Sequence, residues 1–343
     1  MKHINYSIDT LKALCNEAFE KFGFSQEDAA QITDVLILAD LYNIRSHGTQ
    51  RLVRYHKAIE KGSVRVDAVP KIVFETPVSA VIDGQSGMGQ LIASYAMRLA
   101  IEKAKQVGMA FVSVRNSNHF GIAGYYSKMA CDAGFVGISA TNSESIMVHT
   151  GSKQAVLGSN PIAFAMPADP HPFWFDAATT VVPKGKLEVY NKEDKQLFDG
   201  WAVDESGSHK GYGFSMICEL LCAIMSGGAT SNHHVRAPGV GAGTCHAFIV
   251  INPAIFGDPQ VIKDNLSVFM QELRDAKRAD EDRPIYTHGE KEIIAMEGIL
   301  KNGLEVDITT VSEMKSMCEY LGIDHKKYRG DVDLSLAKES VYN

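Results

Sequence analysis

Long hydrophobic runs are missing from this sequence, and its longest apolar stretches fall far short of the roughly 18 residues that a membrane-spanning helix needs. The first ten residues also lack the apolar core of a signal peptide. Charge of one sign is not concentrated anywhere: 34 basic and 41 acidic residues give a net charge of -7, without a block of five or six like charges. These absences argue against a membrane partner and a nucleic-acid partner, and they predict a cytoplasmic protein.

Closely paired cysteines are also absent. The six cysteines are scattered along the chain without a CxxC motif, and Cys218 and Cys222 are the pair whose spacing places them on one face of an expected helix. A zinc site would need two further ligands, and the sequence suggests none nearby. We therefore expect buried, reduced thiols here and no metal site.

Several nucleotide-binding and catalytic signatures are missing as well. The segment 84–89 (GQSGMG) does not match GxGxxG, and it lacks the later acidic residue that a Rossmann ribose site requires. The segment 239–243 (GVGAG) precedes an expected strand rather than following one, and no P-loop GxxxxGK(S/T) is present. Neither GxSxG nor HExxH occurs, so hydrolase and zinc-protease chemistry have no support. A nucleotide, if bound, would bind outside the Rossmann fold.

The apolar periodicity predicts an α/β protein with helices at both ends. Apolar residues at helical spacing predict two helices within the first 42 residues and a third at 51–59. From about residue 78, short strands alternate with helices, which indicates an α/β domain. We expect strands at 80–83, 110–115, 136–141, 162–166, 173–176 and 247–251, and helices at 90–107, 122–133, 212–225, 259–276, 291–302 and 311–321.

His119 is the most informative candidate for a functional residue. It lies in a short loop between the strand expected at 110–115 and the helix expected at 122–133. Open α/β sheets bind ligands at the carboxyl ends of their strands, and Gly121 and Gly124 leave room for another molecule near the backbone. Because the pKa of a histidine is ordinarily about 6.5, His119 is a candidate proton donor and acceptor. From this segment alone, a surface histidine without a role is an equally good interpretation.

Two further segments carry groups that could bind a ligand. Asp176-Ala-Ala-Thr-Thr180 ends a strand and offers hydroxyl and backbone groups, although a plain strand-end turn would look the same. Lys210 precedes an expected helix, where the helix dipole disfavours a cation. A bound anion would offset this, and a solvated lysine is the equal alternative. We expect His233 and His234 to be exposed loop residues.

Seven motifs occur together in a fixed order. They are RSHG at 45–48 with Arg51 and Tyr55, NHFG at 118–121, TNS at 141–143, GSNP at 158–161, FDAATT at 175–180, GWAVD at 200–204 and KGYG at 210–213. In that order they resemble the malate/L-lactate dehydrogenase family, which also includes ureidoglycolate, L-sulfolactate and 2,3-diketogulonate oxidoreductases. The resemblance extends from about residue 5 to about residue 320.

The resemblance implies a fold, a cofactor and an assembly. It implies the non-Rossmann, L-sulfolactate-dehydrogenase-like α/β fold with a mixed sheet, which fits the missing fingerprint. It further implies NAD or NADP as the cofactor and a homodimer. We expect residues 76–257 to form the α/β nucleotide-binding domain. Residues 1–75 with 258–343 would form a helical domain for substrate binding and dimerisation.

The resemblance also implies roles for individual residues. His119 matches the catalytic histidine that exchanges the substrate proton, while His47 and Arg51 match residues that hold the substrate carboxylate, with Tyr55 beside them. These residue types fit hydride transfer, because a histidine can take the hydroxyl proton and an arginine can grip a carboxylate through two parallel hydrogen bonds. The implied dinucleotide contacts are Ser143, Asp176, Ala177, Ala178, Thr179, Lys210, Gly243, Thr244 and Cys245.

The chain departs from the family pattern in two ways. Glu144-Ser145 and Ser152 stand where many relatives have proline and glycine, which alters the pocket lining. Between Gly207 and Lys210 relatives carry a longer segment. Either the loop is shorter here or part of it is missing from the sequence, and we favour the second, because shortening it so close to Lys210 would disturb the cofactor site. An intact mass of 37.5 kDa would exclude that explanation.

The sequence thus predicts an NAD(P)-dependent 2-hydroxyacid dehydrogenase, with malate and oxaloacetate as the first substrate pair to test. Ureidoglycolate and lactate are alternatives within the family. An inactive nucleotide-binding relative is an alternative of another class, and the joint presence of His47, Arg51 and His119 argues against it. A metal-dependent hydrolase would need a ligand cluster that the sequence does not suggest.

Overall fold

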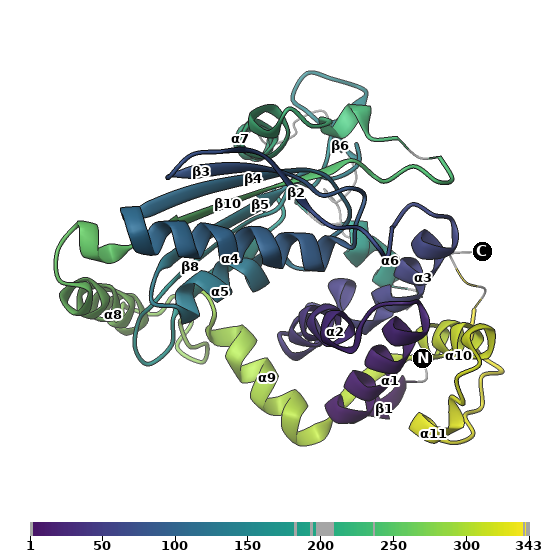
Figure 1. Ribbon diagram of the computed structural model, residues 1–343. Helices are drawn as coiled ribbons and strands as arrows, with labels where there is room; N and C mark the ends of the chain where they lie inside the picture. Colours follow the sequence, from purple (N-terminus) through teal and green to yellow (C-terminus); the bar gives the residue numbers. More distant parts are fainter. Residues whose placement is uncertain are drawn as a thin grey trace.

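The computed structural model describes residues 3–181, 184–192, 195–196, 209–235, 237–338 and 340. Among these residues, seven strands form a central sheet in the order β2-β3-β4-β10-β5-β8-β9 (Figure 1). Of its neighbouring pairs, β3 and β4 are parallel and the others are antiparallel. The strands are β2 (Lys71–Glu75), β3 (Ser79–Asp83), β4 (Met109–Ser117), β5 (Val136–Thr141), β8 (Ile162–Met166), β9 (Phe173–Ala177) and β10 (Thr244–Ile251).

The mixed sheet confirms the predicted α/β class and differs from the parallel sheet of a Rossmann domain. All six strands expected from the sequence are present, and β4 and β10 extend beyond their expected ends. The prediction missed β2, whose five residues are all exposed. It also missed the two-residue strand β6 (Met147–Val148), which pairs with β7 (Ala155–Leu157).

Helices cover both faces of the sheet. Helices α4 (Gly89–Val107) and α5 (Ala123–Asp132) lie on one face (Figure 1). Alanine, methionine and isoleucine side chains along α4 pack on β4 and β10 at helical spacing, and Gly108 ends the helix in the left-handed conformation. Helix α7 (His209–Glu219) continues as a π-helical turn, Leu220–Ile224, on the other face.

A helical layer is built from the two ends of the chain. Strand β1 (His3–Tyr6) pairs with β11 (Leu304–Asp307), so the first and last parts of the chain share one core. Side chains of Ser7, Ser25 and Asp307 cap the helices that follow them. The helices of this layer are α1 (Ile8–Lys21), α2 (Gln26–Leu41), α3 (Leu52–Glu60), α10 (Ile308–Leu321) and α11 (Lys326–Arg329).

Two helices connect the sheet to the last part of the helical layer. Helix α8 (Pro259–Asp275) lies beside β8, where Ser267 accepts a hydrogen bond from the Asp169 backbone. Helix α9 (Glu290–Asn302) runs from the sheet towards α1 (Figure 1). The division into residues 76–257 and residues 1–75 with 258–343 remains our proposal, with α8 in contact with the sheet of the first unit.

The structure bears on two further predictions made from the sequence. The six cysteines are free and buried, which confirms that Cys218 and Cys222 are buried thiols. No helix in the described ranges is long and apolar enough to span a bilayer. The GWAVD motif at 200–204, Gly207 and Ser208 lie outside the described residues.

Candidate active site

A hollow lies where the helical layer meets the ends of the central strands of the sheet. Strand β10 is antiparallel to β4 and β5, so its start lies beside their ends: Thr244 pairs with Ser117, and His246 pairs with Thr141. The loop after β4 contributes His119, and the segment after β5 contributes Asn142 and Ser143. The helical layer contributes His47, Arg51 and Arg54. The hollow encloses a cavity volume of about 140 Å³.

The backbone around His119 is fixed by both of its neighbours. The Asn118 side-chain amide donates to the carbonyl oxygens of Ser86 and Gly87 at 2.9 and 3.0 Å. The ring of Phe120 stacks on His246 with centroids 4.5 Å apart, and both side chains are buried. These contacts hold His119 between two anchored residues, which is the rigidity that a catalytic group requires.

The imidazole of His119 lies among three polar neighbours. Its Nδ1 is 2.7 Å from the Tyr55 hydroxyl, and the backbone N–H of Gly121 approaches the same atom at 3.3 Å. The ring of His47 stacks on it, with centroids 5.5 Å apart and planes at 19°. Both hydrogen-bonding contacts use Nδ1, so Nε2 is the ring nitrogen left to exchange a proton with a ligand in the hollow.

Burial keeps both imidazoles neutral. Burial, reinforced by the positive charge of Arg54, holds the pKa of His119 well below its ordinary value. Burial and the charge of Arg51 lower the pKa of His47 to about 3. The Ser46 hydroxyl lies 2.9 Å from Nδ1 of His47 and orients that ring. A neutral His119 can act as a base, because it has a nitrogen lone pair available.

Two guanidinium groups line the same hollow. Arg51 is 2% exposed, and its Nε donates to the Ser46 carbonyl oxygen at 2.6 Å. Its Nη1 donates to Oε2 of Glu188 at 2.7 Å. Arg54 lies one helical turn further along, on the same side of α3. Glu144 and Glu188 line the same hollow, and the guanidinium N–H groups of Arg51 and Arg54 are the donors that would bind a carboxylate ligand there.

Several of the predicted cofactor residues form one rim. Ser143 and Thr244 line the hollow directly. The Ser143 hydroxyl accepts from the Ser159 backbone N–H at 3.0 Å, and the Ser159 carbonyl accepts from the N–H and the hydroxyl of Thr179. A Cβ on Gly211 would lie 2.6 Å from the Thr179 carbonyl oxygen, so the first turn of α7 rests on this segment.

The exposed side chain of Lys210 is in that first turn, beside the rim. Hydroxyl groups, backbone groups and a lysine at a helix start are the donors that a ribose and a phosphate need. The rim from Ser143 to Lys210 therefore fits the chemistry of a dinucleotide.

Two predicted cofactor residues have their side chains elsewhere. The Asp176 carboxylate accepts from the Gly124 N–H at 2.7 Å at the start of α5, and burial raises its pKa to about 6. It lines a different depression, with Trp174 and Glu292. The Cys245 thiol is buried in the cluster with Cys218 and Cys222, and burial raises its pKa to about 11. Ala177 ends β9 next to Asp176, and Ala178 follows it.

Gly243 precedes β10 with a φ of 74°, in the left-handed region that favours glycine. The backbone N–H of Cys245 donates to the Asn142 side chain at 2.8 Å. This stretch thus orients Asn142, which itself lines the hollow. Within the described ranges, no group of three or more His, Cys, Asp or Glu side chains is arranged to hold a metal ion.

Several residues that line the hollow were not predicted from the sequence. Arg54 could have been found, because it follows Arg51 by one helical turn. His234 was expected to be exposed, which is wrong, since it is half-buried and lines the hollow. Glu188 gave no signal, because α6 (Lys184–Lys192) has no clear apolar periodicity. Asn142, Glu144 and Ser159 also line the hollow.

Comparison with known proteins gives a consistent result. A family model described as malate/L-lactate dehydrogenase matches residues 6–208 and 206–315, and the two matches meet at the short segment before Lys210. The malate dehydrogenase of Pyrococcus horikoshii is 36% identical, over 94% of this chain and 97% of the relative. The L-sulfolactate dehydrogenase of Methanocaldococcus jannaschii is 36% identical, over 92% and 97%.

The fold agrees as well. The crystal structure of malate dehydrogenase from Entamoeba histolytica superposes with a TM-score of 0.90 at 33% identity, covering 94% of this chain and 99% of the other. The predicted L-sulfolactate-dehydrogenase-like fold is therefore confirmed. The chain belongs to the malate/L-lactate dehydrogenase family.

Proposed function

We propose that this protein is a nicotinamide-dependent 2-hydroxyacid dehydrogenase whose first substrate pair to test is malate and oxaloacetate. The observation that carries the proposal is the placement of one neutral imidazole, His119, in the same hollow as Arg51 and Arg54. This combination pairs a proton acceptor with sites for carboxylates. Relatives named malate dehydrogenase, which match nearly the whole chain, support malate as the first choice.

Each residue of the hollow has a separate role in the proposed reaction. Arg51 binds the carboxylate next to the reacting carbon, and Arg54 is placed to bind the second carboxylate of malate. His119 takes the proton of the C2 hydroxyl at Nε2 and returns it to the carbonyl oxygen in the reverse reaction. A nicotinamide cofactor, when bound, supplies the hydride acceptor or donor. His47, stacked on His119, limits the orientations that the catalytic ring can adopt.

The rim beside this hollow is our proposed dinucleotide site. Ser143, Thr179 and Thr244 would offer hydroxyl and backbone groups, and Lys210 would meet a phosphate or a ribose hydroxyl. Asp176 and Cys245 would act by orienting backbone at the start of α5 and around Asn142. We propose NAD as the first cofactor to test and NADP as the second. We also propose, as the family resemblance implies, a cytoplasmic homodimer.

Replacing Arg51 by lysine tests the carboxylate assignment. Lysine keeps the positive charge and loses the planar fork that makes two parallel hydrogen bonds. We expect the KM for oxaloacetate to rise strongly in Arg51→Lys while NADH affinity stays the same. Steady-state kinetics and NADH fluorescence titration measure the two quantities. If the KM for every 2-oxoacid is unchanged, the carboxylate is held elsewhere.

An inactive nucleotide-binding relative is the alternative of another class. NADH binding, seen as a change of fluorescence, is expected under both proposals. Turnover separates them, because a protein that only binds the dinucleotide oxidises no NADH in the presence of any 2-oxoacid. Lactate and ureidoglycolate are the alternative substrates within the family and belong in the same assay.

A further inference from the structure

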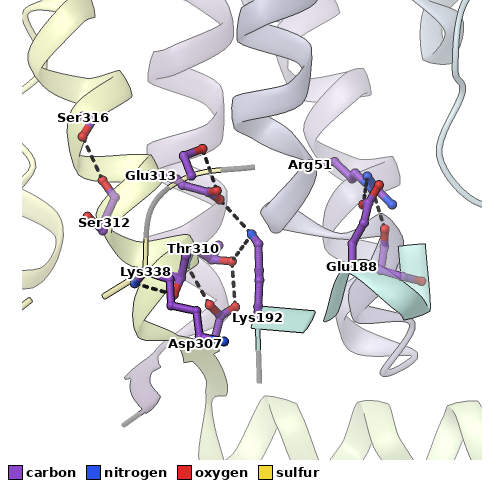
Figure 2. A network of polar contacts seen from close by, with 12 residues as sticks. Arg51, Glu188, Lys192, Asp307, Thr310, Ser312, Glu313, Ser316 and Lys338 are labelled. Atoms are coloured by element: carbon purple, nitrogen blue, oxygen red, sulfur yellow. Dashed lines mark hydrogen bonds and ion pairs between the residues drawn. The ribbon is translucent and has the colours of Figure 1, made fainter. Parts of the chain in front are cut away.

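Helix α6 is held in place mainly by polar contacts. Of its side chains from residue 186 to residue 192, Lys192 is buried, and the apolar or aromatic Leu187, Val189 and Tyr190 are half-buried. None of these apolar side chains is fully buried, so the hydrophobic effect contributes little to holding α6 in position. Glu188 and Lys192 are four residues apart and so lie on one side of the helix. Each makes an ion pair with a different part of the helical layer (Figure 2).

Lys192 anchors α6 to the start of α10. Its Nζ donates to Oε2 of Glu313 at 2.8 Å and to the Thr310 hydroxyl at 3.0 Å. The side chains of Lys192 and Glu313 are 3% and 2% exposed. Thr310 is itself fixed, because its backbone N–H and its hydroxyl both donate to Asp307. The anchor is thus a buried network joined to a capped helix (Figure 2).

Glu188 contacts Arg51 one turn before this anchor. The guanidinium is planar and rigid, so contacts at two of its nitrogens fix the direction of every N–H bond in the group. Ser46 holds Nε and Glu188 holds Nη1. Because the Lys192 anchor holds this part of the helix, the Glu188 carboxylate stays within reach of Arg51. This favours a fixed contact over a carboxylate that substrate displaces.

We propose that Glu188 is a positioning residue that aims Arg51 at the substrate carboxylate, with α6 acting as a brace anchored on α10 through Lys192. The proposal rests on the assignment of Arg51 to the carboxylate under the proposed function. It adds two residues outside the sequence motifs to the machinery of carboxylate binding. A displaceable Glu188 would have the opposite effect, since its removal would strengthen carboxylate binding.

The first experiment removes the Glu188 carboxylate. In Glu188→Ala the KM for oxaloacetate should rise roughly tenfold or more, as for the loss of a hydrogen bond to a charged group. In Glu188→Gln, which keeps an acceptor oxygen, the KM should return much of the way to the wild-type value. The dissociation constant of NADH should stay the same in both variants. Glu102→Ala, which removes an exposed partner of Lys105 on α4, is the matched control.

A second experiment tests the anchor. The double variant Lys192→Met with Glu313→Gln removes both buried charges, so neither is left unpaired. Neither residue contacts Arg51 in the described hydrogen bonds, yet the brace predicts a raised KM for oxaloacetate with unchanged NADH affinity. Wild-type KM in a folded double variant would overturn the role of the anchor.

A third measurement separates this proposal from the proposed function. Oxamate, an unreactive analogue of a 2-oxoacid, is titrated calorimetrically into wild type and Glu188→Ala in the presence of NADH. If the wild type binds oxamate and Glu188→Ala binds it more weakly, the positioning role of Glu188 is supported, even when neither protein reduces a 2-oxoacid. Equal or tighter oxamate binding by Glu188→Ala would overturn the brace. If the wild type binds no oxamate, Arg51 is not a carboxylate site and both proposals fall.

Discussion

The Tyr55 hydroxyl lies 2.7 Å from Nδ1 of His119, although 64 positions separate the two residues in the sequence. The contact joins α3 of the helical layer to the loop after β4. The Gly121 N–H approaches the same nitrogen and can only donate, whereas a hydroxyl can donate or accept. Both contacts engage Nδ1 and leave Nε2 without a protein partner among these contacts. Tyr55 therefore helps to fix the orientation of the His119 ring.

Replacing Tyr55 by phenylalanine should slow the reaction without abolishing it. The variant keeps the ring but loses a hydrogen bond worth about 0.5–1.5 kcal/mol, which corresponds to a roughly two- to tenfold lower kcat. Binding of NADH and of oxamate should be unchanged, because neither contacts the hydroxyl in our account. Steady-state kinetics with malate measures the effect. A kcat equal to that of the wild type would show that the contact does not govern His119.

The pH dependence of malate oxidation should reveal the low pKa of His119. Oxidation needs the neutral imidazole, and burial together with Arg54 holds the pKa of His119 well below its ordinary value. The acid limb of kcat/KM should therefore lie below pH 6.5, since this limb reports the free enzyme. Arg54→Gln removes a positive charge, raises the pKa of His119 and should move the limb to higher pH. A limb that stays in place or moves down contradicts the assignment.

Lys210 should contribute to dinucleotide affinity. Its exposed side chain lies in the first turn of α7, beside the rim formed by Ser143 and Thr179. We expect Lys210→Ala to weaken NADH binding by about 1.5–3 kcal/mol, the usual range for a hydrogen bond to a charged group. Substrate selectivity should survive. Calorimetry with Lys277→Ala as a control for loss of an exposed lysine decides the point, and equal affinities would make Lys210 a solvated residue.

The protein should be a dimer with two-fold symmetry. The helix α7 and its π-helical turn expose a set of large apolar side chains, which a second subunit would cover. Light scattering at micromolar concentration should give twice the mass of the chain, and Ile224→Glu should lower it. A monomer mass for the wild type would contradict this. The exposed side chains are Phe214, Met216, Ile217, Leu220, Ile224 and Met225.

Local patterns in the sequence predicted most of the fold. The ends of β5 and β8 were predicted to the residue: β8, IAFAM, is a continuous apolar run, and β5, VGISAT, is a short segment of mostly small and apolar residues. Strand β2 has no buried face, and β1 and β11 are four-residue strands that pair across almost the whole chain. Neither feature leaves a periodic signal in the local sequence.

The candidate site was predictable only where a motif carried it. His47, Arg51, Tyr55 and His119 were placed by the family resemblance, and the structure brings them together. Glu188 reaches Arg51 from 137 positions away, and such a contact depends on how α6 packs. The Asp176 side chain faces the start of α5 instead of the hollow, because β8 and β9 pair in a register that only the folded sheet defines.

The central claim is that His119 exchanges the substrate proton in hydride transfer between a nicotinamide and a 2-oxoacid. The most direct test follows absorbance at 340 nm with a panel of 2-oxoacids, each with NADH and with NADPH, in wild type and His119→Ala. We predict turnover by the wild type, with oxaloacetate among the substrates, and a loss of about 10²–10⁴ in rate in the variant. NADH affinity should change little. Near-normal turnover by His119→Ala, or no oxidation of either dinucleotide by the wild type, would contradict the account.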